Sequence, residues 1–152
     1  MTTKQRRQYL VLHAVRELVR AMAEHGTDYE RKTRKALDRI EGRVSGMLDA
    51  LGRLTAADSR YFIVAAHNLR TAWTSPDGDR YTPAAYVAIA LTLVADQFSA
   101  IPPRAEHARR EFATLEGMIA TLYQHFDPEM QDNAASEAGE RVAEQYRHLT
   151  AA

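Results

Sequence analysis

Apolar residues in this 152-residue chain recur three and four positions apart in segment after segment, and no segment alternates with a period of two. The first spacing is that of an α-helix with one buried face, whereas a half-buried strand would show the second. Residues that begin or end helices, mainly glycine, proline and capping side chains, divide the chain into six such segments. The sequence therefore predicts an all-α fold without a sheet.

The predicted boundaries rest on local chemistry. Gly26 and Gly52 each follow an apolar repeat, and glycine readily takes the left-handed conformation that ends a helix. Thr55 and Asp58 have the spacing of a capping box, with Asp in place of Glu. Proline follows a capping residue at Pro83, where it suits the first turn. The helices are expected over residues 3–25, 27–51, 55 to the turn at 75–79, 83–100, 103–126 and 128–148.

The most apolar segment begins at Pro83 and continues without a charge until Asp96. A transmembrane helix needs about twenty such residues, so this run is too short to span a bilayer. Ile101 precedes two prolines, and a residue before proline avoids helical dihedral angles. We therefore predict that residues 83–100 form the buried central helix of the fold.

Short connections between long helices make neighbouring helices antiparallel. The prediction is a single domain over residues 1–152, a compact antiparallel bundle of five to six helices around the apolar central helix. Leu91→Ala is expected to cost about 2–5 kcal/mol, because residue 91 lies in that helix. The second and fifth predicted helices have apolar residues at strictly alternating spacings of three and four. These apolar stripes could instead pair two copies of the chain as a homodimer. The predicted core residues are Phe62, Leu69, Val87, Leu91, Val94, Leu115, Ile119 and Leu122.

Composition limits the classes of function. Twenty basic and twenty acidic residues leave no net charge, which argues against a protein that coats polyanions in general. The absence of cysteine excludes disulfides and thiol chemistry and fits a reducing compartment. The first apolar stretch is broken by His13, Arg16 and Glu17, so it does not resemble a signal peptide. We expect a cytoplasmic protein without membrane contact, and the excess of arginine over lysine suggests a bacterial or phage source.

The common catalytic and metal-binding patterns are missing from the sequence. It has no Glu-x-x-His or His-Glu-x-x-His, although His107 and Glu111 lie one helical turn apart. It also has no nucleophile elbow and no glycine-rich phosphate loop. Gly42 and Gly46, four residues apart within a helix, are expected to let a neighbouring helix approach closely. We therefore predict no catalytic residue, no metal site and no cofactor.

One enzymatic alternative remains. A large class of helical-bundle ribonucleases uses an arginine followed after four to six residues by a histidine, where arginine holds phosphate and histidine transfers a proton. Arg60 and His67, separated by six residues, have this spacing. The spacing occurs five times in this arginine-rich chain, so the pattern is not specific. Ribonuclease activity is kept as an alternative hypothesis.

A basic half-helix is the surface feature that stands out. Between Tyr29 and Ala36 almost nothing is apolar, so this half of the second helix must be solvated or bound to a partner. We predict a non-catalytic interaction or regulatory module, such as an inhibitor, adaptor or accessory factor. Its partner would be a protein with an acidic surface, or a second copy offering its acidic C-terminal helix, and nucleic acid is the alternative. The predicted partner-binding residues are Arg31, Lys32, Arg34, Lys35 and Arg39.

Overall fold

The computed structural model is an all-α bundle, as the sequence predicts. It describes residues 2–25, 31–52, 55–62, 64, 83–126, 137, 140–142, 144 and 145. None of these residues lies in a strand. The predicted turn at 75–79, the start of the second helix near residue 28 and Leu69 lie outside them.

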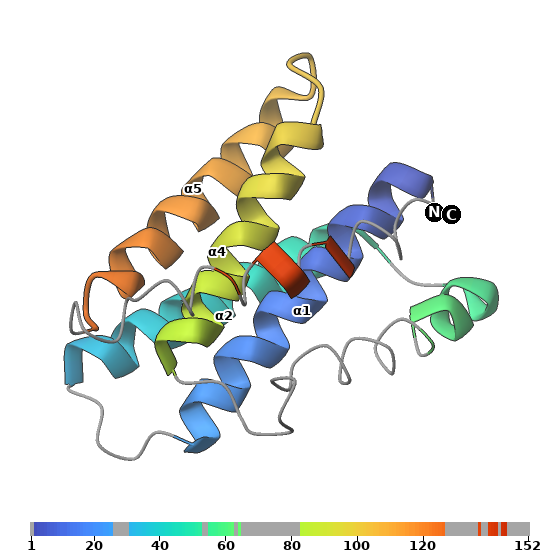
Figure 1. The fold of residues 1–152 in the computed structure, drawn as a ribbon. Helices are drawn as coiled ribbons and strands as arrows, with labels where there is room; N and C mark the ends of the chain where they lie inside the picture. Colours follow the sequence, from blue (N-terminus) through green and yellow to red (C-terminus); the bar gives the residue numbers. More distant parts are fainter. Residues whose placement is uncertain are drawn as a thin grey trace.

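Four long helices form the bundle: α1 (Thr3–His25), α2 (Arg31–Ala50), α4 (Pro83–Ala100) and α5 (Glu106–Tyr123). Helix α1 packs against α2 and α4, and α5 packs against the same two helices from the opposite side. Figure 1 shows α4 and α5 as a hairpin that lies against the pair formed by α1 and α2. The ring of contacts encloses one core.

The first helix has the predicted bounds, and its start has a capping box that the sequence reasoning overlooked. The backbone N–H of Gln5 donates to Thr2 Oγ1 at 3.2 Å, while the backbone N–H of Thr2 donates to Gln5 Oε1 at 2.9 Å. This reciprocal pair satisfies donors that the first turn of a helix leaves without a partner. The Thr-x-x-Gln spacing of Thr2 and Gln5 is the sequence pattern that could have predicted this capping box.

The segment of residues 55–62 also begins with a cap, and the carboxylate of that cap bonds to α1. The backbone N–H of Asp58 donates to Thr55 Oγ1 at 3.1 Å, which confirms the predicted N-terminal cap. The Asp58 carboxylate does not reach back to the backbone of residue 55; it accepts from the Thr55 hydroxyl at 2.8 Å and from Arg6 Nε at 2.7 Å. These hydrogen bonds lower the pKa of Asp58, Thr55 contributing most and Arg6 next.

Helix α4 has the predicted bounds and the predicted central place. Residues 84–90 are buried without interruption, so this part of the helix is covered on all sides. By length and composition alone α4 is long and apolar enough to cross a membrane. More than half of α4 lies buried inside the bundle, as in the core helix of a soluble protein. Its length and apolar composition are therefore weak evidence for a membrane span.

Helix α5 is shorter than predicted at both ends. Residues 102–104 form a turn in which the Ala105 N–H donates to the Pro102 carbonyl, so the helix begins at Glu106. After Tyr123 the backbone N–H groups bond to carbonyls three residues back, which tightens the chain into a turn. The α4–α5 connection is held by Arg109, which donates to the Ile101 carbonyl at 2.8 Å and lies over the Phe98 ring.

Most of the predicted core is confirmed. Leu91, however, is only partly buried, so the prediction that it is a core residue is wrong. The flanking residues Ile89 and Leu93 are 0 % and 1 % exposed, because the covered face of α4 narrows after residue 90. The confirmed core positions are Phe62, Val87, Val94, Leu115, Ile119 and Leu122.

Candidate binding surface

The predicted partner-binding residues all lie on α2, and all five are exposed. Arg31, Lys35 and Arg39 are four residues apart, which is slightly more than one helical turn, so they form a line along one face. We call these three residues the basic stripe. Over eight residues the stripe extends about 12 Å along the helix axis. Among the described residues, none of its three side chains makes a hydrogen bond or an ion pair.

The opposite face of the same half-helix is anchored to the bundle. Thr33, Leu37 and Ile40 are buried, with exposures of 5 %, 3 % and 1 %. Thr33 Oγ1 lies 3.2 Å from His125 Nδ1, just after the end of α5. The expectation that this half is solvated or bound to a partner therefore does not apply to this face, because a short polar side chain provides the buried contact where apolar residues are scarce. The stripe is thus held in a fixed orientation.

The two remaining basic residues lie on the flanks of the stripe. Lys32 lies three residues before Lys35 and Arg34 three residues after Arg31, so each is about 60° around the helix axis from a stripe residue. Each of them is engaged in an interaction within the chain. Of the five predicted residues, the structure therefore singles out three that have charge to offer a partner.

An acidic counterpart lies near the C-terminus. Glu137, Glu140 and Glu144 are helical and exposed. Val142, in the same part of the chain, is fully buried. The described residues therefore include a line of exposed cations on α2 and three exposed carboxylates in this later part of the chain.

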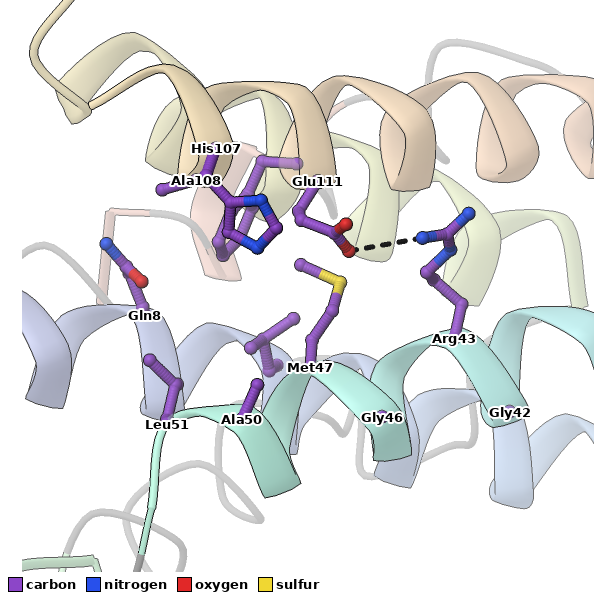
Figure 2. Close-up of a pocket in the computed structure, with 12 residues that line it drawn as sticks. Gln8, Gly42, Arg43, Gly46, Met47, Ala50, Leu51, His107, Ala108 and Glu111 are labelled. Carbon is purple, nitrogen blue, oxygen red and sulfur yellow. Dashed lines mark hydrogen bonds and ion pairs between the residues drawn. The ribbon is translucent and has the colours of Figure 1, made fainter. Parts of the chain in front are cut away.

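A cavity lies between α1, α2 and the start of α5, and the sequence reasoning did not predict it. Its volume is about 590 Å³. In Figure 2 α2 forms one wall and α5 the other, with the side chains of His107 and Glu111 projecting between them. The lining residues are Gln8, Leu12, Gly42, Arg43, Gly46, Met47, Ala50, Leu51, His107, Ala108, Glu111 and Phe112.

Two glycines explain why the cavity is open. A Cβ atom added at Gly42 or Gly46 would meet nothing within 4 Å. The prediction that these glycines let a neighbouring helix approach closely is therefore wrong for the described part of the chain, where no helix lies against them. They instead remove side chains from one wall of the cavity. The four-residue spacing of the two glycines was the sequence pattern that pointed to this wall. A spacing alone does not reveal whether another helix or open space lies opposite the glycines.

The charges in the cavity wall are paired with each other. Arg43 Nη1 donates to Glu111 Oε2 at 3.1 Å, drawn as the dashed line in Figure 2. This ion pair joins α2 to α5, and both side chains are about one-third exposed, at 37 % and 28 %. At such exposure the pair contributes little to stability, so its effect is mainly to leave the lining without a net charge.

A histidine on α1 has a lowered pKa. His13 Nδ1 lies 3.2 Å from Arg16 Nη2, and since a guanidinium can only donate, the ring nitrogen accepts. Burial lowers the pKa of His13 most; Glu17 opposes that shift, and the cations Arg16 and Arg20 add to it. Among the described residues, Arg16 Nε is buried without a hydrogen-bond partner. This arrangement makes His13 sensitive to pH.

The residues of the ribonuclease alternative are not brought together within the described part of the chain. Arg60 is exposed, and His67 lies outside the described residues. Arg6, which precedes His13 by seven residues, is bound to Asp58. Among the described residues, no three histidine or acidic side chains come close enough together to hold a metal ion.

Comparison of the chain with protein-family models, with curated proteins and with solved structures finds no match.

Proposed function

We propose that this protein is a non-catalytic interaction module that binds an acidic protein surface through the basic stripe, Arg31, Lys35 and Arg39. The observation that carries the proposal is the combination of three exposed cations on one line with a buried opposite face. An anchored helix presents its charges in a fixed pattern, so a partner need not pay for ordering them. Complementary charge then favours fast and selective association.

A protein partner fits this surface better than a nucleic acid. Proteins that bind duplex DNA tightly commonly make about six to ten phosphate contacts, whereas this stripe offers three cations. Acidic side chains spaced like Glu137, Glu140 and Glu144 would match the stripe, so a second copy is one partner of the proposed kind.

The test compares two triple variants in affinity capture from the cells that make the protein. The first variant reverses the stripe: Arg31→Glu, Lys35→Glu and Arg39→Glu. The matched control reverses three exposed cations on other parts of the surface: Lys4→Glu, Arg104→Glu and Arg110→Glu. The proposal predicts a partner that the wild type and the control capture and that the stripe variant loses.

Two further measurements separate the alternatives. Capture that disappears on nuclease treatment and weakens steeply with salt would assign the surface to nucleic acid. Sedimentation velocity tests self-association, which Glu137→Gln, Glu140→Gln and Glu144→Gln should abolish if a second copy is the partner. Equal recovery of all partners by the wild type and the stripe variant would refute the proposal.

A further inference from the structure

We propose that the cavity between α1, α2 and α5 is a binding site for a small, neutral and mainly apolar molecule. The proposal is independent of the basic stripe, because it uses none of the three stripe residues. Its volume of about 590 Å³ falls within the range of about 300–1,000 Å³ that is typical of small-molecule sites.

The apolar part of the lining comes from all three helices. Leu12 and Phe112 are each 1 % exposed and Met47 is 8 % exposed, so the inner end of the cavity is formed by side chains that belong to the core. These side chains form a floor that the core already covers, and the apolar surface that remains accessible in the lining belongs to Ala50, Leu51 and Ala108. A ligand in the cavity would cover that surface, and this burial would contribute to its affinity. Methionine adapts its shape to different ligands at low cost, which suits Met47 to this place.

The polar part of the lining sets the chemical class. Arg43 and Glu111 are bound to each other, so neither charge is free to balance a charged ligand. An anion or a cation entering the cavity would lose its water without gaining an unshared counter-charge, which is costly. Gln8 and His107 project into the cavity (Figure 2) and offer hydrogen-bonding groups that would orient one polar edge of the ligand.

The glycines make the site testable without damage to the fold. Gly42 and Gly46 line the cavity, and a Cβ atom built on either meets nothing within 4 Å, so Gly46→Leu adds bulk to the wall without displacing a neighbour. Gly117 is also an exposed glycine within a helix with nothing within 4 Å, and it does not line the cavity. Gly117→Leu is therefore a matched control with the same gain in helix propensity.

The experiment is a fluorescence titration with two probes that share a skeleton. N-phenyl-1-naphthylamine is neutral, and 8-anilino-1-naphthalenesulfonate carries one negative charge. We expect the neutral probe to bind more tightly, and Gly46→Leu to weaken it by about tenfold or more, equivalent to about 1.4 kcal/mol. Gly117→Leu should leave its dissociation constant within about twofold of the wild type, since a twofold change is smaller than the effect of one lost contact.

Three outcomes would overturn the proposal. The first is the absence of saturable binding of the neutral probe. The second is an equal effect of Gly46→Leu and Gly117→Leu, which would place the probe elsewhere on the surface. The third is tighter binding of the sulfonate than of the neutral probe, which would make the natural ligand an anion. Gly42→Leu repeats the test from another position in the wall, and thermal melting of each variant verifies that it is folded.

Discussion

The burial pattern of α4 makes a quantitative prediction for two leucines two residues apart. Leu93 is 1 % exposed, whereas Leu91 is only partly buried. Truncation to alanine removes three carbon atoms, and at about 0.8 kcal/mol for each buried carbon the lost transfer free energy at position 93 is about 2.4 kcal/mol. A cavity that the neighbours fill only in part adds to this cost, so Leu93→Ala should lose about 3–4 kcal/mol.

Leu91→Ala should lose only about 1 kcal/mol, because part of its side chain already contacts water and the remaining gap can be filled by solvent. Urea unfolding followed by circular dichroism measures both free energies, and equal slopes would show that the unfolded states are comparable. For a chain of this size, the difference of about 2 kcal/mol corresponds to about 4–8 °C in melting temperature. If the two variants lose equal stability, or if Leu91→Ala loses more, the assigned orientation of α4 is wrong.

Two predictions concern pH. The pKa of His13 lies below its ordinary value, so its contribution to folding stability is complete above about pH 6.5 and declines as the pH falls toward the folded-state pKa. His13→Gln should flatten this part of the profile of stability against pH. An unchanged profile would show that other groups cause the decline. The pKa of Asp58 is also lowered, so its contribution to folding stability is present above the ordinary carboxyl pKa and declines as the pH falls through the folded-state pKa. Asp58→Asn should therefore lower the melting temperature at pH 7 and have little effect on it near pH 2. Differential scanning calorimetry at the two pH values would measure this difference.

Features of the fold that depend on neighbouring residues in the chain were predictable. The bounds of α1 and α4, the cap at Thr55 and the absence of strands among the described residues follow from side-chain spacing and from local hydrogen bonding, which act over one helical turn. The exposure of the five basic residues on α2 was predictable for the same reason, since a helix segment almost without apolar residues has little to bury.

Other features depend on which helices meet and how far apart they lie. Leu91 and Leu93 have similarly apolar neighbours in the sequence. The positions of α1 and α5 decide which of the two side chains is covered. Gly42 and Gly46 are compatible in sequence with a tight helix contact or with an open wall, and the arrangement of α1, α2 and α5 around the cavity makes them part of an open wall. Periodicity determines the direction in which a side chain points along its own helix, whereas the partner opposite is set by packing between segments far apart in the sequence. The sequence alone thus determined the helices and their exposed charges, and the tertiary structure decided the cavity.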